Sequence, residues 1–202
     1  MRKLTTAVAL ATAAVALISG VSGTAAAAPA PSPAPAPAQA PASAPPPASA
    51  GHLTLRSWTL LNEHGPGPNP GERLTAWVDA RTVDGRTRGH AVVRHVFDGE
   101  GTVLTEFDVD CLTTDGSGAV TVTGPAGTAV ATPADGGPPT TGPAGWRPET
   151  GLTFYPADEH GERRVGWAGV NLRDPSLPDR ATKCTPVPAS LWAIGGGTVV
   201  HK

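Results

Sequence analysis

The chain has 202 residues, of which 39% are hydrophobic and 16% are charged, and its formal net charge is −2 at pH 7. No run or stripe of Lys and Arg occurs, which argues against nucleic acid as a partner. No basic amphipathic helix is evident either, so the sequence gives no means of binding a membrane surface.

The N-terminus has the features of a secretory signal peptide over residues 1–27. Arg2 and Lys3 precede a mildly apolar run without charge, and small residues of the A-x-A type follow up to Ala27. The alternative is an uncleaved membrane anchor, but the run is short and rich in Ala for a bilayer span of about 20 residues. We therefore expect a secreted, extracellular protein without membrane attachment after cleavage.

Residues 28–50 are predicted to be a disordered Pro/Ala-rich linker. Within Pro29–Ala50, nine of the 22 residues are Pro, nine are Ala and none is charged. Proline fixes φ and removes a backbone donor, so we expect an extended, polyproline-like spacer. A solvated tail is favoured over a stalk that holds the domain away from a surface, because no feature before the spacer would anchor it.

Residues 51–202 have the composition of one globular domain with a single core. All 17 acidic residues lie here, together with every Lys and Arg except Arg2 and Lys3, so the mature chain has a net charge of about −4. Apolar residues do not recur at helical spacing. Short runs that alternate between apolar and polar residues recur instead, with turn residues between them.

The alternation predicts an all-β domain, a single antiparallel β-sandwich or barrel of about 8–10 short strands. The clearest strand is 102–112, which places Phe107, Val109 and Cys111 on one face. Asp-Gly pairs are typical of hairpin turns that need positive φ, and they occur at Asp84-Gly85 and within 98–101 and 115–118. Further strands are expected within 52–61, 72–80, 88–98, 118–124, 127–132, 152–157, 163–172 and 197–201.

A long Pro/Gly-rich loop at 132–150 interrupts this rhythm. Loops of this length are either functional or without regular structure, and we expect the centre of this one to lack strands. Trp146 and Arg147 are its only bulky residues. A second loop rich in Gly and Pro occupies 62–72.

The two cysteines, Cys111 and Cys184, allow three interpretations: a nucleophile, metal ligands or a disulfide. Two cysteines in a secreted chain usually pair. A thiol buried beside Val109 and Phe107 would have a raised pKa and would be a poor nucleophile. Two cysteines without a nearby pair of histidines also fall short of a zinc site. We therefore predict a Cys111–Cys184 disulfide.

The motifs of common catalytic and metal sites are not found. The sequence contains no H-E-x-x-H, G-x-S-x-G, S-x-x-K or Gly-rich phosphate loop. His90 and His95 are five residues apart on a predicted strand and should face opposite sides. Asp108, Asp110 and Asp115 suggest calcium, but their spacing does not match an EF-hand loop, and a solvated face is favoured for the outward Asp108/Asp110 pair. We expect no catalytic residue, no metal and no cofactor.

The aromatic residues divide into expected core and possible site. Four tryptophans lie in strand-like or apolar contexts and are predicted to be in the core: Trp58, Trp77, Trp167 and Trp192. If the domain has a ligand-binding site, its candidates are Trp146, Arg147 and Tyr155, because an accessible Trp beside an Arg is a common recognition pair.

The domain resembles small secreted β-rich actinobacterial proteins loosely labelled repetin-like. The resemblance covers about half of the domain and depends on "FDVDCL" at Phe107–Leu112, "AVTVTG" at Ala119–Gly124, "GLTFYPAD" at Gly151–Asp158, and Cys184. A Pro/Gly-rich stretch separates the second and third of these motifs, where the family has a short segment. The resemblance implies a secreted β-domain and transfers no site residue.

The sequence therefore predicts a secreted, non-catalytic β-domain, interpreted as a surface or extracellular binding module whose partner would be a cell-envelope polymer or a small ligand. A small-ligand carrier barrel and an extracellular hydrolase are the alternatives. The three interpretations differ in what the structure should contain. A surface-binding module should expose an aromatic patch, a carrier should enclose an apolar cavity, and a hydrolase should bring titratable groups together in a cleft.

Overall fold

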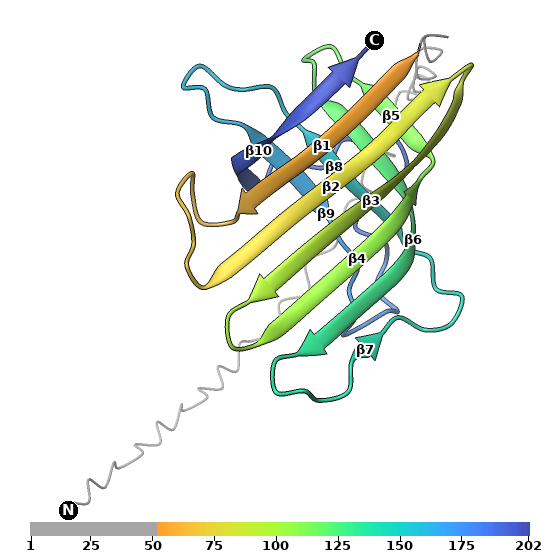
Figure 1. Cartoon of the computed structure of the whole chain (residues 1–202). Helices are drawn as coiled ribbons and strands as arrows, with labels where there is room; N and C mark the ends of the chain where they lie inside the picture. Colours follow the sequence, from red (N-terminus) through yellow and green to blue (C-terminus); the bar gives the residue numbers. More distant parts are fainter. Residues whose placement is uncertain (1–51) are drawn as a thin grey trace, which may run out of the picture. The chain divides into compact units, whose positions relative to one another are not determined.

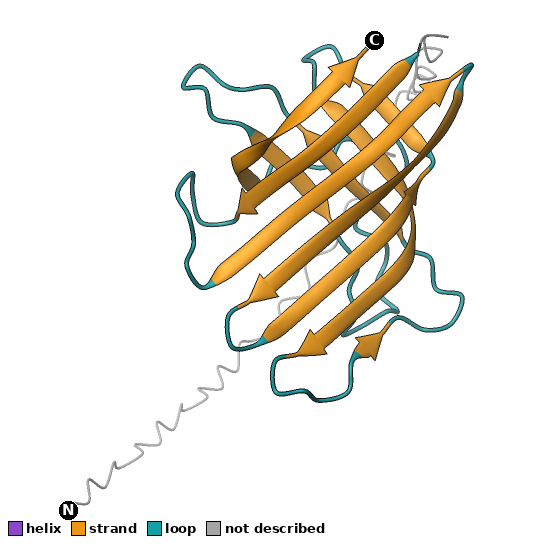
Figure 2. Ribbon diagram, viewed as in Figure 1, coloured by secondary structure: helices purple, strands orange, loops and turns teal. Residues whose placement is uncertain are grey.

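The computed structural model describes residues 52–202, so the predicted signal peptide and Pro/Ala-rich linker lie outside the described residues. This part of the chain consists of strands and connecting loops (Figure 2). The prediction of an all-β domain is thereby confirmed. Within residues 52–202, no helix is long and apolar enough to cross a membrane.

Ten strands follow one another in the described part of the chain, and all of their pairings are antiparallel. Their bounds are β1 (Leu53–Asn62), β2 (Glu72–Val83), β3 (Arg86–Phe97), β4 (Gly101–Val109), β5 (Cys111–Thr114), β6 (Val120–Pro133), β7 (Thr140–Thr141), β8 (Glu149–Phe154), β9 (Arg164–Ala168) and β10 (Leu191–His201).

The strands close into a barrel of eight (Figure 1). The order around the barrel is β4-β3-β2-β1-β10-β9-β8-β6, and β6 returns to pair with β4. The short β5 continues the line of β4 along β6, while β7 adds two residues to the other end of β6. Of the two all-β architectures that the sequence left open, the structure is therefore the barrel.

The predicted Asp-Gly turns make the tight hairpins. Asp84 and Gly85 both have positive φ, 51° and 71°, as a two-residue turn between β2 and β3 requires. At the β5–β6 turn, the Asp115 carboxylate accepts hydrogen bonds from the Ser117 hydroxyl and from backbone N–H groups. The hydrogen bond from the Ser117 hydroxyl is the main reason that the pKa of Asp115 lies below its ordinary value.

The barrel interior is filled by apolar side chains from every part of the wall. Because successive residues of a strand point to opposite sides, alternate residues of β1 and β2 are buried and their neighbours are exposed. Phe107 of β4 lies at the centre of this core and is fully buried. Other large, fully buried members are Leu55, Leu74, Val78, Val122, Leu152 and Val165.

The wall made of β6, β8 and β9 is buried on both faces because residues 169–190, here called the strap, cover it from outside. Successive residues of β8 are buried, in contrast to the alternation of β1. Two outward threonines of this wall accept strap backbone hydrogen bonds, Thr123 from Cys184 at 3.0 Å and Thr153 from Val187 at 2.8 Å. A Cβ on Gly166 would lie 2.7 Å from the Val187 carbonyl carbon, so the strap passes directly over this glycine.

The disulfide between Cys111 and Cys184 fixes the strap to the barrel. The prediction that Cys111 shares a face with Val109 is wrong, because a bulge reverses the alternation at Asp110. Asp110 donates its N–H to the Thr123 carbonyl, and Cys111 is also the register partner of Thr123. Leu112 consequently joins the interior core, and Cys111 faces outward toward the strap.

Candidate functional site

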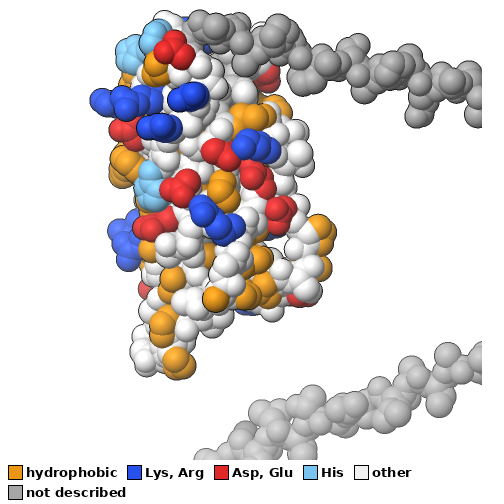
Figure 3. Space-filling model, turned by 90° about the vertical axis from the view of Figure 1, so that its right-hand side faces the viewer, with side chains coloured by type: hydrophobic (Ala, Val, Ile, Leu, Met, Phe, Trp, Pro, Cys, Tyr) orange, Lys and Arg blue, Asp and Glu red, His pale blue; other side chains and the backbone are white. Residues whose placement is uncertain are grey.

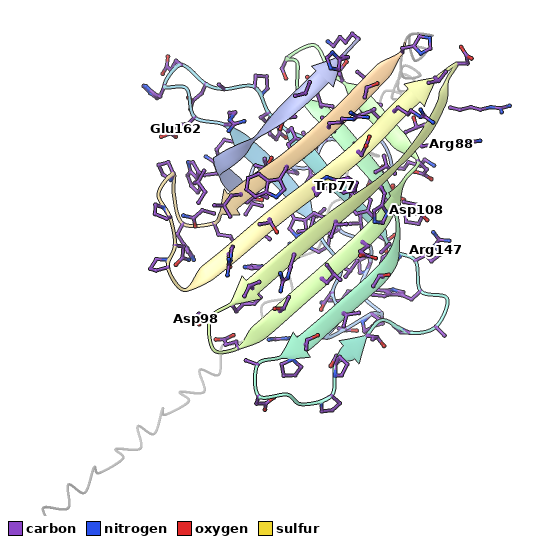
Figure 4. The ribbon with its side chains drawn as sticks, viewed as in Figure 1. Trp77, Arg88, Asp98, Asp108, Arg147 and Glu162 are labelled. Atoms are coloured by element: carbon purple, nitrogen blue, oxygen red, sulfur yellow. A yellow bond between two sulfur atoms is a disulfide. The ribbon has the colours of Figure 1, made fainter. Side chains whose placement is uncertain are left out.

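Two tryptophans that the sequence assigned to the core lie on the outside of the barrel. Trp58 of β1 and Trp77 of β2, the latter labelled in Figure 4, are direct register partners. They are 54% and 42% exposed. On β1 the buried positions on either side of Trp58 are Ser57 and Thr59. The alternation therefore places small polar residues inside and the indole outside, and the core prediction is wrong for this pair.

The two indole rings lean in opposite directions and cover a broad surface. Trp58 lies over Gly196 of β10, where a Cβ would come within 2.7 Å of its Cε3 atom. Trp77 lies toward His90 of β3, with ring centroids 6.2 Å apart. The rings therefore span β10, β1, β2 and β3, a width of roughly 14 Å at about 4.8 Å per strand. Val199 of β10 is 51% exposed beside them. We call Trp58, Trp77 and Val199 the tryptophan platform.

Charged and polar groups border the platform. Arg56 and Asp79 are register partners with 3.6 Å between Nε and Oδ2, and both are exposed. His90 lies 4.0 Å from an Asp108 carboxylate oxygen. The platform thus offers flat apolar surface with donors and acceptors at its edge, an arrangement that recognises ligands having both an apolar face and hydroxyl groups.

The loop residues Trp146 and Arg147, which are neighbours in sequence, are not part of the tryptophan platform, but Arg147 shares Asp108 with His90 at its border. Arg147 donates to Asp108 at 3.0 Å (Figure 4), and the half-buried Trp146 packs on Gly142, where a Cβ would lie 2.9 Å from the indole Cζ3. A hollow of about 520 Å³ separates this loop from β6. Figure 3 views the barrel from the right-hand side of Figure 1, and shows acidic and basic side chains interspersed on that face.

The segment at 132–150 contains more regular structure than the sequence predicted. β6 continues to Pro133, β8 begins at Glu149, and Thr140–Thr141 pair with β6 as the short strand β7. The prediction of no strand at its centre is therefore wrong. The two threonines keep the backbone donors that the surrounding prolines lack, and this allows the local pairing.

Tyr155, the third predicted candidate, does not join Trp146 and Arg147. It follows the end of β8, whereas Arg147 precedes the start of that strand. Its hydroxyl donates to the Val187 carbonyl at 2.7 Å, so it holds the strap. Burial, with a smaller contribution from the charge of Asp115, raises the pKa of Tyr155.

The acidic pair on the clearest strand makes exposed ion pairs. Asp108 contacts Arg147, and Asp110 accepts a hydrogen bond from Lys183 of the strap at 2.6 Å. The hydrogen bond to Asp110 raises the pKa of Lys183. Both carboxylates are accessible to solvent and already have cationic partners, as expected for a solvated face.

The barrel end that carries the β1–β2 loop contains a hollow of about 600 Å³, here called the barrel mouth. His95 lines this hollow, and its ring centroid is 3.8 Å from that of Phe97. His90 lies on the outer face beside Trp77, so the two histidines face opposite sides, as their spacing predicted. Trp167 lines the wall with its ring 6.4 Å from that of Phe107. The other lining residues include Glu63, His64, Val93, Val103, Thr105, Arg180 and Leu191.

Sequence reasoning missed both the tryptophan platform and the barrel mouth. The parity of β1 contained a signal for the platform, because Leu55, Ser57 and Thr59 alternate with Arg56 and Trp58. The barrel mouth had no local signal, because strands distant in sequence form it. The chain matches no protein-family model, no curated protein and no solved structure, so its function has to be argued from its own geometry.

Proposed function

We propose that the protein is a secreted, non-catalytic module that binds an extracellular polysaccharide, such as a cell-envelope polymer, on the tryptophan platform. The observation that supports this is the exposure of Trp58 and Trp77, side by side on the barrel wall. Leaving two indoles in water forgoes the stabilisation that their burial would give, and clustered exposed aromatics commonly mark binding surfaces.

The chemistry of a sugar polymer matches this surface. A pyranose ring has an apolar C–H face that packs on an indole, and its hydroxyls need donors and acceptors at the edge. Arg56, Asp79 and His90 lie where they would contact such hydroxyls. The width across four strands accommodates more than one sugar ring, and this favours a polymer over a monosaccharide.

The small-ligand carrier is the second candidate, and the barrel mouth is the observation in its favour. A carrier of the usual kind holds its ligand inside the barrel, but Leu55, Phe107 and Leu152 are buried in the core that fills the interior. The barrel mouth is also bordered by the exposed Glu63 and His64, so it opens to solvent. The structure thus gives the platform more support than an enclosed carrier site.

The test is co-sedimentation of the purified protein with insoluble polysaccharides and with cell-wall polymer. Trp58→Ala and Trp77→Ala should each weaken retention by about tenfold, the usual effect of truncating an aromatic anchor, and should leave the melting temperature nearly unchanged. Trp146→Ala is the control, because it removes a half-buried indole of the 132–150 loop that is not part of the tryptophan platform. Equal retention of all four proteins, or a loss confined to Trp146→Ala, would overturn the assignment to the platform.

A further inference from the structure

We propose that the β1–β2 loop beside the barrel mouth binds a divalent transition-metal ion of the zinc type, with Glu63, His64 and Glu72, the first residue of β2, as its protein ligands. This site lies at the barrel end, apart from the wall that carries the tryptophan platform, and does not depend on polysaccharide binding. One imidazole nitrogen and two carboxylate oxygens, one from each residue, all lie within 4.8 Å of one another. Imidazole and carboxylate are both established zinc ligands.

The three groups need only a small adjustment to coordinate one ion. Ligand bonds of about 2.0–2.2 Å in a tetrahedron place neighbouring ligand atoms about 3.3–3.6 Å apart. The His64 Nε2 atom is 3.6 Å from Glu72 Oε2, which is already close to that value. The side chain of His64 is exposed, and Glu63 is exposed as well. Each can therefore move by the required ångström or so through rotation of its side chain.

Glu72 is the fixed member of the group. Its side chain is only 14% exposed, and both of its oxygens have partners from other residues. Oε1 contacts His95 Nε2, and Oε2 accepts a hydrogen bond from Asn69 Nδ2 at 3.1 Å. The His95 ring in turn packs on Phe97. Outer groups of this kind orient a ligating carboxylate and increase metal affinity.

The loop between β1 and β2 holds the two exposed ligands close to Glu72. Pairing of Leu61 with Leu74 brings its two ends together. Asn62 accepts a hydrogen bond from the His64 N–H at 3.0 Å, which positions the histidine backbone beside the strand end. The fold has therefore already brought the ligands near one another, which reduces the loss of chain entropy when a metal ion binds.

The donor set favours a borderline transition ion over calcium. Calcium takes six to eight oxygen ligands, whereas an imidazole with two carboxylates suits zinc and its neighbours. Three protein ligands leave a coordination position, and the hollow of about 600 Å³ lined by Glu63 and His64 offers space for a further ligand there. Residues 1–51 contain no His, Cys, Asp or Glu, so competing side-chain donors of these types all lie in the described part.

The probe is zinc chloride, titrated calorimetrically into the purified full-length secreted protein. We expect a single zinc ion per chain, and about tenfold or greater loss of affinity in His64→Ala and in Glu63→Gln, two variants at exposed positions. His160→Ala is the control, because His160 is equally exposed in another turn beside Glu159. Zinc should raise the melting temperature of the wild type and of His160→Ala, but not that of His64→Ala.

Three outcomes would overturn the proposal. The first is equal zinc affinity in the wild type and His64→Ala. The second is loss of binding in His160→Ala as well, which would indicate nonspecific association with surface histidines. The third is calcium binding at least as tight as zinc binding, which would contradict the coordination chemistry. Normal retention on polysaccharide by His64→Ala would leave the function of the platform intact, so the two proposals are tested separately.

Discussion

Removal of the Cys111–Cys184 disulfide should destabilise the domain without opening the barrel. The two cysteines are 73 residues apart, and the chain-entropy relation assigns about 4 kcal/mol to a cross-link of this span. For a domain of this size, that loss should lower the melting temperature by roughly 10 °C or more. The double variant Cys111→Ala/Cys184→Ala is appropriate because of the backbone at Cys184, which has a φ of 61°. Alanine and cysteine both carry a Cβ, so the conformational cost of this positive φ is comparable in the variant and the wild type.

Urea denaturation gives the change in unfolding free energy, and hydrogen exchange shows where the structure loosens. The Val187 amide, which donates to Thr153, should exchange faster in the double variant because the strap loses its covalent attachment. Amides of the paired β1 and β2 strands should keep their order of protection, because their hydrogen bonds do not involve the strap. A loss below about 1 kcal/mol, or uniform loss of protection across the barrel, would refute this account.

Three further variants test the packing around the strap and the core. Tyr155→Phe removes the hydrogen bond to Val187 and should cost about 1 kcal/mol near neutral pH by urea denaturation. Burial raises the pKa of Tyr155 above its ordinary value of 10.0. The stabilisation that comes from this raised pKa is complete below pH 10 and is lost as the pH rises through the folded-state pKa. Between neutral pH and a pH above 10, the free energy of unfolding should therefore fall less in Tyr155→Phe than in the wild type. Gly166→Ala should force the strap away from β9, seen as faster exchange of the Val187 amide. Phe107→Ala should cost about 3–5 kcal/mol in the same denaturation assay, because it empties the centre of the core.

The sequence specified the all-β class well because the evidence for it is local. Alternation over short windows and Asp-Gly turns identified the strands and hairpins, and φ at Asp84 and Gly85 is positive, as such a turn needs. Barrel closure could not be derived in the same way. It depends on β6 pairing with β4 on one side and β8 on the other, and on β1 meeting β10, which are non-local choices. The disulfide was predictable because only two cysteines are present.

The errors come from assuming that alternation continues undisturbed or that large residues must be inside. The bulge at Asp110 changed the side of Cys111, and nothing in the strand sequence indicates an extra residue there. Trp58 was assigned to the core because it lies in a strand-like, apolar context, although the parity of its own strand places it outside. Tyr155 and Trp146 were grouped because both are aromatic, but β8 separates them.

The two sides of the barrel explain where a partner can bind. The strap covers β6, β8 and β9, so their outward residues had to be small or able to bond its backbone, as Gly166, Thr123 and Thr153 are. The wall of β10, β1 and β2 is outside this cover, and its outward positions contain Trp58 and Trp77 instead. A fold that needed only solubility would place polar residues there, as antiparallel strands with one wet face normally do. The difference in side-chain choice between two walls of one barrel therefore supports the proposal that another molecule binds on the open wall.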